Sequence, residues 1–215
     1  GLSAQESAPA DTLAVSAPAP RPKKITYGGP GFRFALGGGY TYRLGKEMPS
    51  TSYAQREVAD KLRHGFNLAA DLHYVFASGV GLGVNANFVS SNTEGKGYVG
   101  RFTETQNILY IGPSMLLRAD GRKAALIGEI GVGGLFLTDK IKAGRQQKLI
   151  GTTFGGHASL GGELKLSPTT AIGLKVSANI GAIKELKSGS ESIELRDKAS
   201  ASSLMVTAFI SFRGR

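Results

Sequence analysis

Eight segments of this chain alternate apolar and polar residues, and the connections between them alternate as well, long and polar and then short and tight. A period of two places successive side chains on opposite faces of a β-strand. In the first segment, residues 31–44, Phe32 and Phe34 fall on one face and Arg33 and Ala35 on the other. Seven more follow at 62–77, 79–91, 104–118, 123–138, 150–166, 170–184 and 201–213. This double alternation predicts an antiparallel up-and-down sheet that closes into a β-barrel.

The connections predict which rim of the barrel carries which loops. Tight-turn signals stand at Ser78-Gly79, at Asp120-Gly121 and at Ser167-Pro168-Thr169. The other four connections, 46–61, 92–103, 139–149 and 185–200, are long and polar and read as loops. An even number of strands puts both termini at the short-turn rim. Pro113 cannot donate to a ladder, so we expect a bulge or a register slip there.

The apolar face decides between a membrane barrel and a soluble one. A lipocalin-like barrel would turn its apolar face inward around a ligand. Here the apolar face carries almost no charge through the strand centres, and its aromatic residues gather toward the two strand ends, as lipid contact requires. We therefore expect this face to meet lipid and the polar face to fill a plugged, non-conducting interior. The expected interior network consists of Arg33, Asp71, His73, Arg118, Glu129, His157, Glu163, Lys165 and Lys175.

Composition excludes several classes of protein. The 215 residues include no cysteine, so we expect no disulfides, thiolate metal sites or thiol catalysis, and no lipid anchor on an N-terminal cysteine. The net charge of +10 comes from bases that are scattered and not interleaved with stacking aromatics, so we expect no nucleic-acid partner. The excess charge is instead expected in solvated loops and in the polar interior.

The chain divides into an arm and a barrel. Residues 1–30 are rich in proline and alanine and have no apolar period, which predicts an extended periplasmic arm. Gly1 to Gln5 looks like the remnant of a secretory signal peptide with cleavage after Ala4. The arm is either a spacer or a tether that a partner captures. Residues 31–215 form the expected transmembrane barrel.

No catalytic, cofactor or metal site is predicted. His73 shares a face with Asp71 and His157 with Ser159, but such neighbours lie ~6–7 Å apart along a strand, too far for a catalytic dyad. We therefore expect both histidines to be polar plug residues. One basic connection could touch lipopolysaccharide phosphates or could simply be solvated; its residues are Lys140, Lys142, Arg145 and Lys148.

The pattern of strand, glycine-rich centre and tight turn resembles the small eight-stranded outer-membrane β-barrels of the OmpA/OmpX type. The segments Phe32–Tyr40 and Tyr110–Ser114 are similar to outer-membrane-barrel domains of Bacteroidota. The resemblance covers residues 31–215 and implies a Gram-negative outer membrane, with periplasmic termini and extracellular long loops. Such barrels typically end in an aromatic residue, whereas here Phe212 is followed by Arg213-Gly214-Arg215.

The leading functional expectation is a non-enzymatic, non-porin barrel that serves as a structural or accessory subunit of an envelope protein complex. Its expected partners are outer-membrane lipid, lipopolysaccharide and other outer-membrane or periplasmic proteins. One alternative is a surface adhesin or ligand-binding barrel that acts through its long loops. Two others are a narrow solute channel and, weakest, a lipid-modifying enzyme.

Overall fold

The computed structural model describes residues 30–44, 62–97, 100–143, 145–188 and 191–214. Within these ranges the chain forms β-strands that all pair antiparallel. They are β1 (Gly31–Arg43), β2 (His64–Val75), β3 (Val80–Gly97), β4 (Gly100–Asp120), β5 (Ala124–Ala143), β6 (Arg145–Lys165), β7 (Thr170–Ser188), β8 (Glu191–Ser200) and β9 (Ser203–Arg213). None of the described residues belongs to a helix that is long and apolar enough to cross a membrane.

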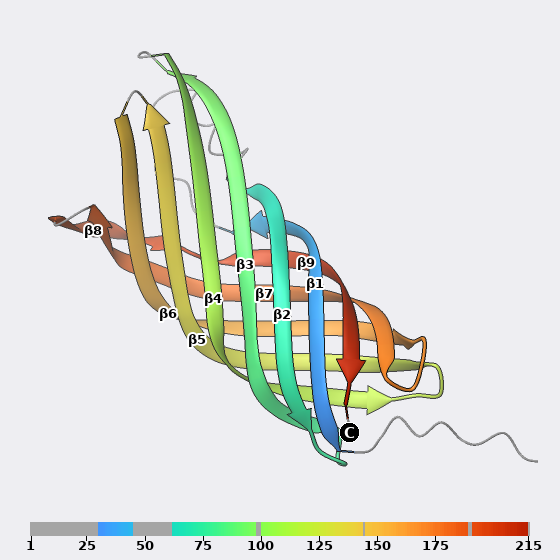
Figure 1. The fold of residues 1–215 in the computed structure, drawn as a ribbon. Helices are drawn as coiled ribbons and strands as arrows, with labels where there is room; N and C mark the ends of the chain where they lie inside the picture. The colour runs from blue at the N-terminus through green and yellow to red at the C-terminus, as the bar shows by residue number, and fades with distance from the viewer. Residues whose placement is uncertain (1–29, 45–61, 98–99, 144, 189–190, 215) are drawn as a thin grey trace, which may run out of the picture.

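The sheet closes on itself, as predicted. From β1 to β7 each strand pairs with the next along the chain, and β9 pairs with both β7 and β1. β8 and β9 both lie against β7 and are separated only by Ala201 and Ser202, so together they form the eighth strand of the barrel. The C-terminal end of β9 lies beside the start of β1 (Figure 1).

The register fixes the tilt of the strands. Following Cα partners once around the barrel from Arg33 leads back to β1 at Arg43, ten residues further along. An eight-stranded barrel with this stagger has strands tilted by about 35–45° to its axis and an interior just wide enough for side chains. The fold therefore leaves room for packed residues and not for a wide aqueous channel.

The three short turns lie where the sequence predicts them. At the first, Gly79 adopts a φ of 84° and donates its N–H to the carbonyl of Phe76 at 3.0 Å. At the second, Gly121 donates to the carbonyl of Ala124 at 2.8 Å. At the third, the hydroxyl of Ser167 accepts the N–H of Thr170 at 3.0 Å. These turns and the C-terminal end of β9 define one rim, which we call the short-turn rim.

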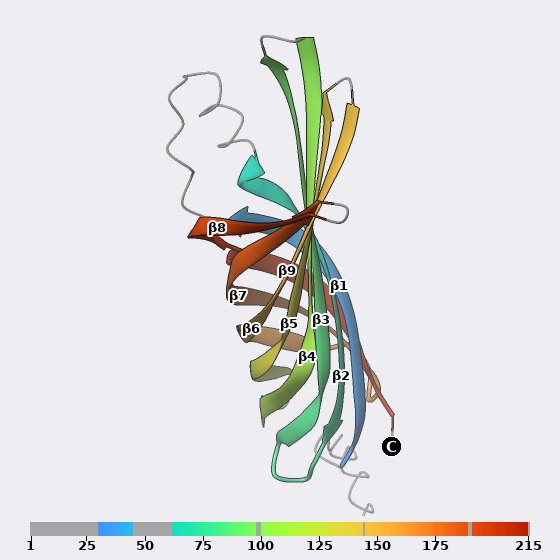
Figure 2. The same ribbon diagram turned by 90° about the vertical axis from the view of Figure 1, so that its left-hand side faces the viewer.

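The expected long loops are wrong in three of four cases. Residues 92–97 and 100–103 extend the β3–β4 hairpin, and residues 139–143 and 145–149 extend the β5–β6 hairpin. Residues 185–188 and 191–200 form the outer part of the β7–β8 hairpin. In these segments polar residues occur on both faces of the strand. The alternation of apolar and polar residues that marks a lipid-facing strand is therefore missing, and the sequence does not identify these segments as strands. These hairpins project well beyond β1 and β2 (Figures 1 and 2). The fourth connection, 46–61, lies outside the described residues.

The expected bulge or slip at Pro113 is also wrong. Pro113 pairs with Val84 in an unbroken β3–β4 register. On the side of β4 that faces β5, the pairs Ile111–Gly134 and Ser114–Gly131 belong to one register, although Gly112 and Pro113 between them have no paired partner on β5. The missing N–H therefore interrupts the ladder to β5 locally and does not displace the strand.

The outward face is apolar, as predicted. Phe32, Leu68, Leu82, Ile130 and Leu174 all expose half or more of their side chains. On β5 the outward apolar residues run from Leu126 to Phe136, eleven residues, which matches the ~9–11 residues of a tilted transmembrane strand. We call this surface the lipid face.

Candidate functional site: the barrel interior

The interior begins at the short-turn rim with a buried carboxylate, Glu163. Arg33 donates from Nε at 3.0 Å and from Nη2 at 2.6 Å to its Oε1, and Arg118 Nη1 bonds Oε2. Ser211 Oγ donates to Oε1 at 3.1 Å. These residues come from β1, β4, β6 and β9, so a single anion ties half of the strands together. Because all four are buried, the pairs are screened little by water.

A second carboxylate, Asp120, lies closer than Glu163 to the end of the barrel, in the short-turn rim itself. Asp120 accepts from Arg118 Nε at 3.1 Å and from Lys165 Nζ at 2.7 Å, with Arg213 at 3.8 Å. Lys165 Nζ also donates to the carbonyl of Gly121 at 2.7 Å. The β4–β5 turn is therefore fixed to the ends of β6 and β9.

A third ion pair crosses the barrel above an aromatic ring. Lys175 Nζ donates to Asp71 Oδ2 at 2.6 Å, and Arg33 Nη1 lies 3.9 Å from the same oxygen. The Phe209 ring lies 5.7 Å from the Arg33 guanidinium and 6.0 Å from Lys175 Nζ, within the range of cation–π contact. Arg33 thus joins the Asp71 and Glu163 clusters into one network.

His73 lies between Ser114 and Glu129. Its Nε2 is 2.8 Å from Ser114 Oγ and 3.5 Å from Glu129 Oε1. A serine–histidine–carboxylate relay needs the hydroxyl and the carboxylate on different ring nitrogens, whereas both lie on Nε2 here. His73 is also completely buried, so no substrate could reach it. The arrangement holds strands together and does not fit nucleophilic catalysis.

His157 lies farther from the short-turn rim, in a cluster with the side-chain amides of two asparagines. Its Nδ1 lies 2.8 Å from Asn179 Oδ1 and 3.4 Å from Asn87 Nδ2, and its ring is 5.5 Å from that of Tyr110. Ser159, which the sequence places on the same face, is not a hydrogen-bond partner of His157 among the described contacts. The two sequence-adjacent dyads are therefore not assembled, while contacts between distant strands are.

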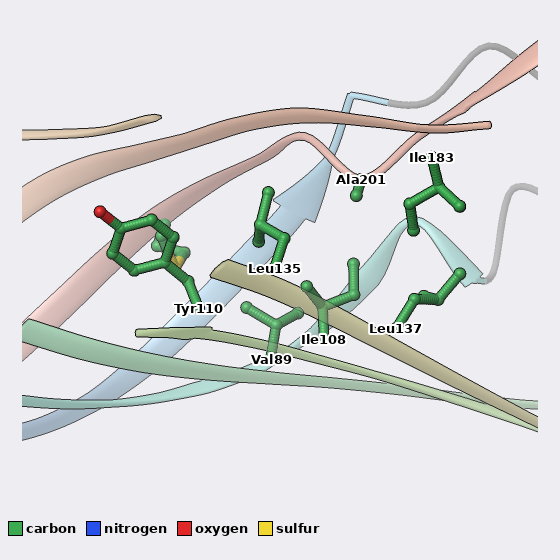
Figure 3. Packing of buried hydrophobic residues seen from close by; sticks show 8 residues of the cluster. Val89, Ile108, Tyr110, Leu135, Leu137, Ile183 and Ala201 are labelled. Carbon is green, nitrogen blue, oxygen red and sulfur yellow. The ribbon is translucent and has the colours of Figure 1, made fainter. Parts of the chain in front are cut away.

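Two apolar clusters also lie in the interior, and sequence reasoning missed both. The larger is buried toward the hairpin end and takes side chains from β3, β4, β5, β7, β9 and the junction between β8 and β9: Val89, Ile108, Tyr110, Leu135, Leu137, Ile183, Ala201 and Met205 (Figure 3). The smaller lies near the short-turn rim and contains Ala35, Val75, Leu116, Ile127 and Phe209. An unbroken apolar run such as Leu135-Phe136-Leu137 is the sequence signal for these clusters, because it makes both the inward and the outward face of the strand apolar. The interior is therefore filled by apolar as well as polar side chains.

Inward glycines make these layers possible. A Cβ on Gly155 or Gly181 would lie 2.3 or 2.2 Å from Leu135 Cδ1, so the leucine occupies space that only glycine leaves open. A Cβ on Gly173 would likewise lie 2.5 Å from the Phe209 ring. Large side chains therefore reach into the lumen and occupy the space that these glycines leave.

Above the larger cluster, polar residues end the interior beyond the lipid face. Gln106 Nε2 lies 3.5 Å from Asp139 Oδ2. Burial, and then the negative charge of Asp139, raise the pKa of Glu104 to about 7. Burial also lowers the pKa of Arg43, against the attraction of Asp139 and Glu104. The charge of Glu104 in this outer cap therefore changes near neutral pH.

The expected basic loop is a paired hairpin instead. Lys140 stands opposite Lys148, Lys142 opposite Gln146, and Ala143 opposite Arg145 at the end of β5 and the start of β6. The side chains of Lys142, Arg145 and Lys148 lie outside the described residues. The backbone nevertheless brings four bases onto one ladder, and the sequence showed only their proximity.

A closed eight-stranded antiparallel barrel with an apolar outer band and a filled interior defines the class of small outer-membrane β-barrels. Solved structures of that class are similar to this chain. OprG from Pseudomonas aeruginosa has a TM-score of 0.55 at 14% identity, over 87% of this chain and 99% of its own. A major outer membrane protein from Thermus thermophilus has a TM-score of 0.54 at 13% identity, over 85% and 99%. Neisserial surface protein A has a TM-score of 0.53 at 11% identity, over 85% of this chain and 97% of its own.

At such identities the likeness shows the fold alone. No protein-family model matches the sequence. No curated protein sequence matches it either. The fold is thus that of an outer-membrane barrel of the OmpA/OmpX type.

Proposed function

We propose that this protein is a non-conducting barrel of a Gram-negative outer membrane that serves as a structural or accessory subunit of an envelope protein complex. The short-turn rim and both termini face the periplasm, and the long hairpins face outward, as in barrels with short periplasmic turns. The filled lumen is the observation that supports the proposal that the barrel does not conduct ions. Two apolar clusters and a buried ion network occupy it among the described residues.

The lipid face supports the membrane location. Its described side chains between Leu126 and Phe136 on β5, and at the same depth on the other strands, are apolar or small. A Lys or Arg at the bilayer midplane would cost ~2–4 kcal/mol, so a charge-free band is what lipid contact selects. In water the same band would be a large exposed apolar surface that favours aggregation.

The projecting hairpins support a role in binding proteins. The β2–β3 pairing ends at Phe66 and Ser90, so Ser91–Gly97 of β3 pairs only with β4 among the described residues. An unpaired strand edge can accept a strand from another chain. The hairpins therefore offer a partner an edge outside the lipid face.

Two measurements test this proposal. We expect gentle detergent extraction from native membranes, followed by size analysis and mass spectrometry, to recover the chain in a stoichiometric assembly. Asn92→Lys adds charge to the edge of β3 that has no partner strand among the described residues, and Thr105→Lys makes the same change at its cross-strand partner on β4, which pairs on both sides. We expect the first variant to weaken the assembly and the second to leave it intact. A chain recovered alone would contradict the accessory role.

Conductance tests the closed interior independently. Purified protein in planar bilayers should show no steady ion current, because buried ion pairs and two apolar clusters occupy the lumen among the described residues. A steady current would instead support the narrow channel. The surface adhesin is the second candidate, favoured by the same projecting hairpins, and it predicts binding that is lost when the β3–β4 tip is shortened while the chain stays unassociated in the membrane.

A further inference from the structure

The lipid face contains a groove close to the short-turn rim. It has a volume of about 790 Å³ and crosses β5, β6, β7, β9 and β1. Small residues, Gly162 and Ala208, form its floor, and the larger Leu36, Leu164 and Ile172 stand along it. These residues point outward, since the three large side chains expose about half of their surface. The groove is therefore open to the bilayer, and Glu163 and Phe209, which are buried on the interior side, also border it.

The groove runs down toward the short-turn rim. Its large residues form one row of cross-strand partners, Leu36, Ile210, Ile172 and Leu164, which continues to Ala124. Leu36 is the sixth residue of β1, whereas Ala124 is the first residue of β5, and both strands begin at this rim. The row therefore reaches the rim at the β4–β5 turn, directly beside Lys123.

Positive charge gathers at this end of the groove. Arg122 and Lys123 are exposed in the turn, and neither forms an ion pair with a described residue. The nearby carboxylate of Asp120 is already engaged by Arg118 and Lys165. The other two short turns, at 76–79 and 166–169, contain no charged side chain. The cations of the short turns thus lie only where the groove ends.

We propose that this groove binds an anionic phospholipid of the leaflet at the short-turn rim, with one acyl chain over Gly162 and Ala208 and the phosphate beside Arg122 and Lys123. Within a bilayer the hydrophobic effect does not favour one lipid-facing surface over another, because acyl chains are as apolar as leucine. Selectivity comes from close packing in the groove and from attraction between anionic headgroups and basic residues at the interface. A zwitterionic headgroup carries its own cation and gains less.

Lipid retention measures this selectivity directly. The full chain, inserted in nanodiscs of equal parts phosphatidylglycerol and phosphatidylcholine, is transferred to detergent, and the lipids that remain bound are counted by native mass spectrometry. We expect phosphatidylglycerol to be retained at least threefold over phosphatidylcholine. Lys123→Glu should abolish that preference, while the matched Lys140→Glu at the opposite end of β5 should preserve it.

A second pair of variants tests the groove itself. Gly162→Leu fills the floor, and Gly156→Leu makes the same change on the same strand outside the groove; in each case a Cβ would meet only a backbone oxygen at 3.9 Å. The first should lower retention of phosphatidylglycerol and the second should not. If Gly162→Leu does not fold, Ala208→Leu replaces it.

The inference rests on the membrane location proposed above and not on the accessory role. Equal retention of the two lipids by the wild-type chain would overturn it. So would equal effects of Lys123→Glu and Lys140→Glu, or of the two leucine variants. A chain that inserts into nanodiscs but shows no preference refutes the lipid site alone, whereas a chain that does not insert refutes the membrane location as well.

Discussion

Replacing Glu163 with glutamine is the sharpest test of the interior network. The change keeps the size of the side chain but removes the anion between Arg33 and Arg118, both buried. Removing one partner of a buried ion pair costs about 3–5 kcal/mol, because the remaining charge is left uncompensated. Here Arg118 keeps Asp120 at 3.1 Å and Arg33 keeps Asp71 at 3.9 Å. We therefore expect the lower part of that range, about 3 kcal/mol.

Equilibrium urea unfolding of the barrel in lipid vesicles measures this loss. Asp120→Asn is the matched control, since Asp120 is a quarter exposed and also contacts Arg118, and partly exposed pairs contribute about 0–1 kcal/mol. Glu163→Gln should lower the free energy of unfolding several times more than Asp120→Asn. A Glu163→Gln barrel within about 0.5 kcal/mol of wild type would refute the view that this anion holds the four strands together.

Three further predictions follow from the same structure. Gly83→Ala should destabilise the barrel by about 1–3 kcal/mol, because its Cβ would lie 1.9 Å from a backbone oxygen of β2, whereas Gly162→Ala should be nearly neutral; thermal unfolding compares them. Ile130→Arg at mid-depth of the lipid face should cost about 2–4 kcal/mol in vesicles, and Thr138→Arg beyond Phe136 much less. Burial raises the pKa of Glu104 from 4.5 to about 7, so the folded chain keeps a proton there that the unfolded chain releases, and the free energy of unfolding should fall as pH rises through that window. The fall between pH 5 and pH 8 should be smaller in Glu104→Gln than in wild type.

The turns and the alternating faces follow from local sequence. Phe32, Arg33 and Phe34 alternate in exposure as their order predicts, since successive residues of a strand point to opposite sides. Gly79 marks its turn because it takes a positive φ. The fold class could be predicted for the same reason, because closure requires only that each strand pair with the next.

The interior partners could not be predicted in this way. Glu163 meets Arg33 across 130 positions of sequence, and Lys175 meets Asp71 across 104. Which inward residues share a level depends on the stagger of ten residues around the barrel, and no local pattern encodes that number. The apolar clusters around Leu135 and Phe209 were missed for a related reason, since an inward leucine is expected only once the opposing glycines are known.

The sequence by itself determined the strand order, the turns and the face that meets lipid, because a two-residue period and turn-forming residues act over a few positions. Only the tertiary structure decided how far the hairpins extend, which buried charges pair, and where small outward residues line up into a groove beside the basic β4–β5 turn. These features arise from residues on different strands, and they meet only when the sheet is tilted and closed.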